Sequence, residues 1–176
     1  MNKLLIFAVF MISSLFGYAG EGDGFTSKSD FISYLVNYRN ILGVEKGKVD
    51  SMLGVDCKSS KVQLVERFSA NSYTFAYSCK IENSRFLVAF NDETPKKKIN
   101  DFILVASFDS YEELSSKVGL KYGKCRDRLA NKEYSSCTYS IGRDPELGTK
   151  RIAVLEKNEE KKAAMFTLSV ESGDGP

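Results

Sequence analysis

The chain has 176 residues, of which 25 are lysine or arginine, 23 are aspartate or glutamate and none is histidine. A formal net charge of +2, with the basic residues scattered among acidic ones, argues against a nucleic-acid-binding surface, which needs a basic stripe. The lack of histidine excludes a Ser-His-Asp or Cys-His catalytic relay and removes the commonest metal ligand.

Residues 1–19 have the order of segments that is typical of a secretory signal peptide. A positively charged start at Lys3 precedes an apolar run over residues 4–16, and a small residue follows at Ala19. The apolar run is shorter than the roughly 20 residues that a membrane-spanning helix needs. We therefore expect cleavage after Ala19 and a periplasmic or secreted protein that does not span a membrane. A retained N-terminal anchor is the alternative.

The four cysteines predict two disulfides, because an exported protein folds in an oxidising compartment. Three pairings are possible, and the order along the chain favours Cys57–Cys79 and Cys125–Cys137. Each bridge would close a short loop and would stabilise the fold by roughly 3 kcal/mol through the unfolded chain. Zinc binding is disfavoured, since the spacings lack the C-x-x-C form.

The front half of the mature chain, residues 20–108, is expected to begin with two helices. Apolar residues recur at helical spacing between Phe31 and Leu42, after an N-cap at Ser27 or Ser29 and before Gly43. A shorter helix is predicted over residues 46–53.

Alternating polar and apolar residues then predict four strands in the front half. These cover residues 61–68, 73–79, 85–90 and 99–108. Aromatic residues fall on one side of the second strand and small hydroxyl residues on the other, so one face should pack on helices and the other should face water. Residues 91–98, which include Pro95, are expected to form a loop at the sheet edge.

The rear half, residues 109–171, is expected to repeat this layout in a shorter form. Ser110 and Glu113 have the spacing of a capping box at the start of a helix over residues 111–118. Further strands are predicted, and residues 172–176 are expected to be a disordered tail. The four predicted strands are residues 124–129, 134–141, 149–156 and 162–170.

The predicted fold class is therefore α+β, with two tandem repeats of short helices followed by a four-stranded antiparallel sheet. The helices would cover one face and leave the other face open. One continuous sheet and two separate sheets both fit this pattern.

A glycine–valine spacing in the front half carries a family resemblance. Residues 43–54 read G-V-E-K-G-K-V-D-S-M-L-G, with Gly43, Val49 and Gly54 at the marked places. This stretch resembles the second helix of the β-lactamase inhibitor protein and of outer-membrane assembly lipoproteins of the SmpA/OmlA type, which share its fold. Cys57 just past the glycine and Cys79 on a following strand are also similar to the inhibitor. The resemblance implies tandem α+β repeats with one disulfide each.

The chain departs from that family in two respects. The rear half lacks the glycine–valine spacing and a second helix, and no lipobox cysteine lies near Ala19. The missing cysteine argues against a lipid-anchored assembly protein. No loop motif of the inhibitor can be matched, so none of its target-facing residues is assigned here.

The candidate site is a protein-binding surface on the open sheet face. Arginine and tyrosine are the residue types that most often dominate protein interfaces. The loop over residues 91–98 would protrude and present acidic groups to a basic or hydrogen-bonding pocket. The predicted partner-binding residues are Arg67, Arg85, Tyr134 and Arg151 on the face, and Asp92 and Glu93 in the loop.

We expect a non-enzymatic protein with no catalytic residue, no metal and no cofactor. The most concrete function is that of an inhibitor or periplasmic immunity protein that occludes the active site of a secreted or envelope hydrolase, a cell-wall-targeting toxin included. The alternative is an envelope-assembly accessory protein that binds an outer-membrane or cell-wall component. A small enzyme that uses Lys, Tyr or carboxylate groups is a third hypothesis. The sequence leaves the oligomeric state open.

Overall fold

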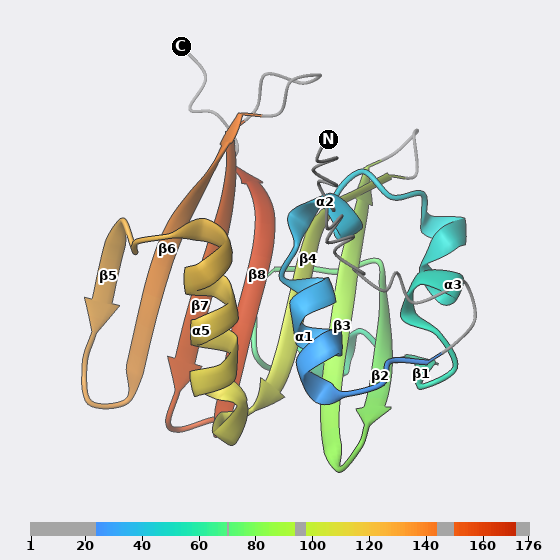
Figure 1. The fold of residues 1–176 in the computed structure, drawn as a ribbon, viewed down its shortest axis with the longest axis horizontal. Helices are drawn as coiled ribbons and strands as arrows, with labels where there is room; N and C mark the ends of the chain where they lie inside the picture. Colours follow the sequence, from blue (N-terminus) through green and yellow to red (C-terminus); the bar gives the residue numbers. More distant parts are fainter. Residues whose placement is uncertain (1–23, 70, 94–97, 144–149, 172–176) are drawn as a thin grey trace, which may run out of the picture.

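The computed structural model describes residues 24–69, 71–93, 98–143 and 150–171 (Figure 1). The predicted signal peptide, residues 1–19, and the predicted tail, residues 172–176, lie outside the described residues. Over the described ranges the protein is α+β, with a single eight-stranded antiparallel sheet and a few short helices.

The strand order in the sheet is β1-β2-β3-β4-β8-β7-β6-β5. The front half of the chain supplies β1 to β4 and the rear half supplies β5 to β8. The halves join where β4 pairs with β8, from Phe102 opposite Leu168 to Ser107 opposite Ala163, so they share one continuous sheet. The strands are β1 (Cys57–Ser60), β2 (Phe75–Ile81), β3 (Ser84–Glu93), β4 (Lys98–Ser107), β5 (Asp127–Ala130), β6 (Tyr134–Arg143), β7 (Lys150–Asn158) and β8 (Ala163–Glu171).

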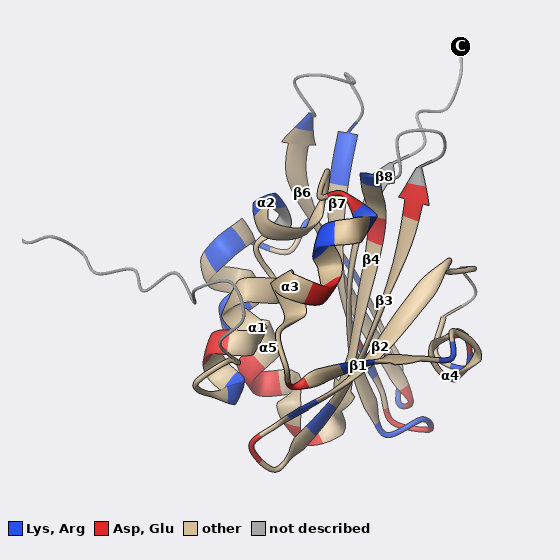
Figure 2. Cartoon of the chain, turned by 90° about the vertical axis from the view of Figure 1, so that its right-hand side faces the viewer, with Lys and Arg blue, Asp and Glu red and all other residues tan. Residues whose placement is uncertain are grey.

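Most of the helices lie on one side of the sheet, which we call the helix face; we call the opposite side the far face (Figure 2). The helices on the helix face are α1 (Lys28–Leu35), α2 (Tyr38–Ile41), α3 (Val49–Leu53) and α5 (Tyr111–Tyr122). The helix α4 (Gln63–Glu66) lies on the far face, and the two 3-10 helices are η1 (Lys46–Lys48) and η2 (Phe108–Ser110).

The main hydrophobic core fills the helix face across both halves of the sheet. The strands contribute every second residue, which is the pattern predicted for a sheet packed on helices. The largest fully buried side chains of this core include Phe86 and Phe90 on β3, Phe102 on β4 and Phe166 on β8. Buried helix residues that pack on them are Phe31, Ile32 and Leu35 from α1, Val49 and Leu53 from α3, and Leu114 and Val118 from α5.

The first predicted helix is divided into α1 and α2. Its start is confirmed, because the Ser27 hydroxyl accepts a hydrogen bond from the Asp30 amide at 3.1 Å. The helix ends after Leu35, and the Asn40 side-chain amide donates to the Tyr34 carbonyl at 3.1 Å. Asparagine side chains compete for backbone groups in this way, which a count of apolar spacing does not detect.

The strand predicted over residues 61–68 is wrong, because this segment contains α4. Val62, Val65 and Phe68 also lie three residues apart, and this helical spacing is the one the fold uses. Val65 is fully buried, with Val62 and Phe68 packed around the same cluster. The first strand is instead the short β1, which directly follows the turn after α3.

The far face is not open over its whole area, which corrects a second prediction. The segment that contains α4 covers the middle of the sheet, where small and apolar side chains form a second hydrophobic cluster. Figure 2 shows α4 standing alone on this side. The buried residues of the cluster are Val65, Tyr73, Ala76, Ala89, Ile103, Val105, Ala163 and Met165.

The predicted capping box at Ser110 and Glu113 is not formed. Ser110 sits at the N-cap of α5, but its hydroxyl lies 3.1 Å from that of Ser107 and makes no capping bond. The Glu113 carboxylate instead pairs with the Lys28 ammonium at 3.2 Å. This ion pair joins the first helix of the front half to the helix of the rear half.

Both predicted disulfide pairings are confirmed. Cys57 and Cys79 are directly opposite each other on β1 and β2. Cys125, two residues before β5, is joined to Cys137 on β6. Each bridge therefore fastens an edge strand to its only neighbour in the sheet.

A buried tyrosine predicts how stability depends on pH. The Tyr77 hydroxyl donates a hydrogen bond to Asp50 Oδ1 at 2.7 Å. Burial, and then this bond to a carboxylate, raise the pKa of Tyr77 above its ordinary value of 10.0. Because the folded-state pKa is the higher one, the contribution of the neutral phenol is complete below pH 10 and is lost as the pH rises above it.

The variant Tyr77→Phe is therefore expected to lower the free energy of unfolding by about 1–2 kcal/mol at pH 7, since a hydrogen bond to a charged group is lost. Its stability should also fall less steeply above pH 10 than that of the unmodified protein. Urea titrations at several pH values measure both effects. Equal slopes above pH 10 in the two proteins would contradict the assignment.

Candidate functional site

The far face of the rear half carries a row of partly exposed side chains that α4 does not cover. Thr138 on β6 is opposite Val154 on β7, which is opposite Thr167 on β8. Ile152 lies two residues before Val154 on the same side, and Leu129 on β5 is 69% exposed. We call these five residues, Leu129, Thr138, Ile152, Val154 and Thr167, the rear sheet surface.

The chemistry of the rear sheet surface is apolar and hydroxylic. β-branched residues are stiff, so they present their methyl groups to a partner with little loss of side-chain entropy. The strands that hold them are paired on both sides, except at the β5 edge. The surface is therefore a preorganised one, set on rigid elements.

Tyr134 lies at one end of this surface and is held in place. Its hydroxyl donates a hydrogen bond to Glu156 on the neighbouring strand β7. Burial is the largest cause that raises the pKa of Tyr134, and the bond to the Glu156 carboxylate raises it further. The phenol therefore stays neutral and fixed at neutral pH. Among the predicted partner-binding residues whose side chains the structure describes, Tyr134 is the one that borders the rear sheet surface.

Arg85 lies on the far face of the front half, as predicted. It is exposed on β3, directly opposite Lys80 on β2. Three strands, β4, β8 and β7, separate β3 from the strand of Tyr134. Arg67 is exposed at the C-cap of α4 instead of on a strand. The structure therefore does not bring Arg67 and Arg85 together with Tyr134.

The prediction that Arg151 lies on the far face is wrong. On β7 it has the same phase as Ala153 and Leu155, and both of these are buried in the core of the helix face. A register shift in β6 between Ser140 and Gly142 sets Arg151 opposite Gly142. The sequence contained a signal for this, because residues 151, 153 and 155 share one side of β7, and Ala153 and Leu155 are apolar residues suited to the core.

The prediction that Asp92 lies in a protruding loop is also wrong. β3 continues through Asp92, and the Asp92 side chain is only 7% exposed. Its carboxylate lies 3.8 Å from the Lys46 ammonium, which also lies 4.6 Å from the centre of the Phe75 ring. Asp92 therefore holds η1 against the sheet. The Glu93 side chain, like residues 94–97, is outside the described residues.

Neither a metal cluster nor a membrane helix is found in the described part of the chain. Across residues 24–69, 71–93, 98–143 and 150–171, no three His, Cys, Asp or Glu side chains are grouped so that they could hold a metal ion. Over the same ranges no helix has the length and apolar character needed to cross a membrane.

Sequence reasoning missed the rear sheet surface, although the sequence contains a signal for it. Residues 152–155 of β7 are all apolar, whereas a strand with one face in water alternates apolar and polar residues. Ala153 and Leu155 fill the core of the helix face, and this leaves Ile152 and Val154 on the far face. A strand that is apolar on both sides needs a second covering layer or presents an apolar surface.

Comparisons of the chain with protein-family models, with curated proteins and with solved structures gave no match.

Proposed function

We propose that this chain is an exported, non-enzymatic protein-binding module that inhibits a secreted or envelope hydrolase, and that the rear sheet surface contacts the enzyme. The observation that carries the proposal is the unequal covering of the far face. The segment that contains α4 covers the middle of this face, from Ala76 on β2 to Met165 on β8, whereas apolar and hydroxyl side chains beyond it in the rear half stay at least partly exposed. These side chains are Leu129, Thr138, Ile152, Val154 and Thr167.

The front half indicates what kind of surface fits the rear half. There the connection from β1 to β2 includes α4, and its Val62, Val65 and Phe68 pack on the sheet. In the rear half, β5 and β6 are joined directly through Asn131, which bonds to the Tyr134 carbonyl at 2.8 Å. The rear half thus has no covering segment of its own between these strands. The occupant we propose is a short apolar segment of the partner, from the rim of its active site.

The rear sheet surface adjoins the hydrophobic cluster that α4 covers, and this continuity favours a protein partner over a small ligand. Thr167 is opposite Ile103, which α4 covers, and Val105 is opposite Met165 in the same buried cluster. A partner seated on Thr138 and Val154 would extend this cluster across β7 and β6. Apolar side chains of the partner and of the rear sheet surface would both be removed from water in the new contact.

The mechanism of inhibition would be occlusion of the active site. The strands β5 to β8 span roughly 14 Å at the usual strand spacing, which is wide enough to cover a cleft entrance. The Cys125–Cys137 bridge fastens β5 to β6 and keeps this part of the sheet rigid. Affinity would then come from preorganisation more than from buried area.

Export is supported by the signal-peptide pattern of residues 1–19 and by the two disulfides. We further propose that the front and rear halves are two tandem α+β units. In each half a disulfide joins the first strand, or the residues just before it, to the second strand, and the two sets of strands appear in mirrored order in the sheet.

The test uses the disulfide-bonded protein and the envelope fraction of the source cells. Peptidoglycan-hydrolysing and peptidase activities are measured in that fraction with and without added protein, and bound proteins are identified by mass spectrometry. We expect one hydrolase to be bound in a one-to-one complex and its activity to be lost. A complex with a wall or outer-membrane component, without loss of any activity, would favour the accessory function instead.

The double variant Thr138→Lys/Val154→Lys is expected to weaken this complex at least 100-fold, because two charges would be buried against an apolar partner. The control Ser78→Lys adds a charge on the same face in the front half, where Ser78 is exposed, and should change the affinity less than threefold. A complex that tolerates the double variant would exclude the rear sheet surface as the contact.

A further inference from the structure

We propose that β5 pairs with β5 of a second copy of this chain, antiparallel and about a twofold axis, so that two sheets join into one. This contact uses the edge of the sheet, whereas the rear sheet surface lies on the far face, and it would leave Thr138 and Val154 uncovered. The inference therefore does not rest on the proposed function, and it is tested without the hydrolase.

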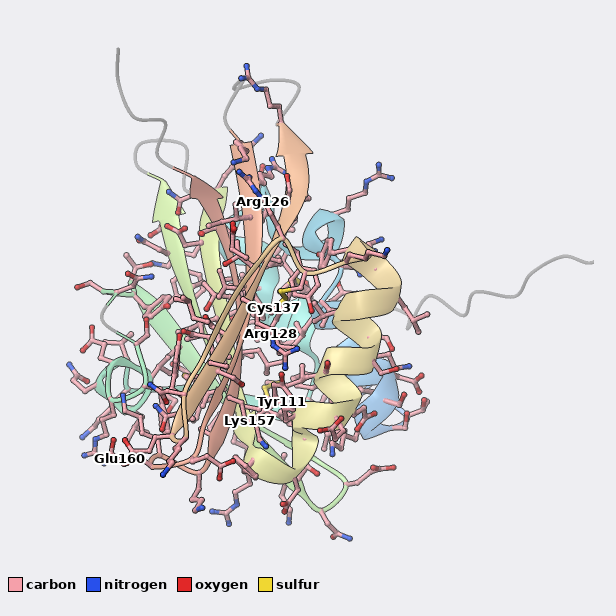
Figure 3. The ribbon with its side chains drawn as sticks, turned by 90° about the vertical axis from the view of Figure 1, so that its left-hand side faces the viewer. Tyr111, Arg126, Arg128, Cys137, Lys157 and Glu160 are labelled. Carbon is pink, nitrogen blue, oxygen red and sulfur yellow. A yellow bond between two sulfur atoms is a disulfide. The ribbon has the colours of Figure 1, made fainter. Side chains whose placement is uncertain are left out.

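The edge at β5 is open to a second strand. β5 is the last strand in the sheet order, and no described helix or strand lies beyond it (Figure 1). All four of its residues are exposed, and α5 packs over β6, β7 and β8 instead. Figure 3 looks onto this edge, where Arg126 and Arg128 are labelled. The Cys125–Cys137 disulfide fastens β5 to β6, so little backbone entropy would be lost on pairing.

The backbone groups that face this open edge belong to Arg128 and Ala130. The Asn131 amide donates to the Tyr134 carbonyl at 2.8 Å, so the backbone of Asn131 faces β6. Because the direction alternates along an antiparallel strand, Leu129 also faces β6, whereas Arg128 and Ala130 face away from it. Each of these two residues offers one N–H and one C=O to an incoming strand.

One symmetric register uses all four of these groups. With the axis at Leu129, Arg128 of one copy exchanges two hydrogen bonds with Ala130 of the other, and the reverse pair does the same. An axis at Arg128 would set two guanidinium groups against each other and Ala130 opposite Arg126, whose amide is already bonded to β6 at 2.8 Å. An axis at Ala130 would oppose Arg128 with Lys132, which lies past the end of β5. The backbone therefore selects the axis at Leu129.

The side chains also suit this register. Leu129 would meet Leu129 of the second copy in a non-hydrogen-bonded pair, where opposing side chains come closest. Leu129 is 69% exposed, so the contact would remove apolar surface of both copies from water. Asp127 would be opposite Asn131 and Arg128 opposite Ala130, so no two like charges of β5 would face each other directly.

The other edge of the sheet, at β1, is protected against the same pairing. The Asp56 carbonyl accepts from the Lys80 amide at 3.0 Å, so by alternation Cys57 and Ser59 face away from β2. A symmetric pair of β1 strands would then have its axis at Lys58 and would set two ammonium groups against each other. Lysine is a common protection of edge strands. The leucine at the equivalent place in β5 is the observation that points to a second copy.

Sedimentation equilibrium of the disulfide-bonded protein tests the pairing. Two four-residue strands make a small contact, so we expect a weak dimer, with a dissociation constant between about 10 μM and about 1 mM. The measurement covers protein concentrations over the same range. A protein that stays monomeric throughout it would overturn the proposal.

Charge exchange at position 129 tests the register. Leu129→Lys and Leu129→Glu should each weaken self-association at least about tenfold, because like charges would meet at the axis. An equimolar mixture of the two variants should associate at least about threefold more tightly than either alone, because Lys then meets Glu. The matched controls, Leu120→Lys and Leu120→Glu, change a leucine that is 83% exposed on α5, and should alter association less than about twofold. Single variants that associate like the unmodified protein, or a mixture no tighter than its components, would exclude this contact.

Discussion

Replacement of Phe166 by alanine is expected to lower the free energy of unfolding by about 3–5 kcal/mol, which is the usual cost of deleting a buried phenylalanine ring. Phe166 is fully buried on β8, between Leu104 on β4 and Leu155 on β7. Its ring also stacks on that of Tyr122 in α5, with centres 6.3 Å apart. The ring thus packs where the two halves of the sheet meet.

Guanidinium or urea unfolding followed by circular dichroism measures this loss. The control Leu120→Ala removes a leucine that is 83% exposed on α5, and should change the free energy of unfolding by less than about 0.5 kcal/mol. Two separate unfolding transitions in the Phe166→Ala protein would mean that the halves can stay folded apart. An unchanged midpoint would contradict the burial of the ring.

Removal of the front disulfide by Cys57→Ala with Cys79→Ala is expected to cost about 3 kcal/mol or more. The closed loop has a sequence separation of 22, and the loop-entropy relation gives about 3.4 kcal/mol for that length. Cys79 is 1% exposed and belongs to the main core. Its loss therefore adds a packing defect to the entropy of the longer unfolded chain.

The rear disulfide provides the comparison. Cys125 is exposed, and the loop to Cys137 has a separation of 12, so Cys125→Ala with Cys137→Ala should cost somewhat less, about 2.8 kcal/mol. Differential scanning calorimetry of the two double variants and of the unmodified protein ranks the three stabilities. A rear variant that is less stable than the front variant would contradict this order.

The sequence was sufficient to predict the features that depend on local pattern. The Ser27 cap, the alternation of apolar residues on β2 and β3 and the order of the cysteines all predicted what the structure contains. Each of these depends on residues that are neighbours along the chain or on a period of two within a strand.

The wrong predictions came from choices that only tertiary contacts decide. The spacing of Val62, Val65 and Phe68 fits a helix as well as a strand, and the small residues Ala76 and Ala89 on the sheet beneath select the helix. Pairing with β4 likewise keeps Asp92 in β3, where the predicted loop would have begun. A sequence alone does not state these partners.

The candidate site was harder to predict than the fold. Arginine and tyrosine side chains were chosen by residue type, and they lie on separate elements, with Arg67 at the C-cap of α4, Arg85 on β3 and Tyr134 on β6. The surface we now favour consists of ordinary threonine, valine and isoleucine residues. The apolar run over residues 152–155 indicates an apolar far side of β7, and the position of α4 shows which part of the far face it leaves uncovered.

Photo-crosslinking within the complex with the captured hydrolase tests most directly whether the rear sheet surface contacts the enzyme. A benzophenone amino acid is placed at position 154, on the rear sheet surface, or at position 78, on the same face of the front half. We predict a covalent adduct with the hydrolase from position 154 and none from position 78. An adduct from position 78 without one from position 154 would contradict the proposal that the rear sheet surface binds the partner.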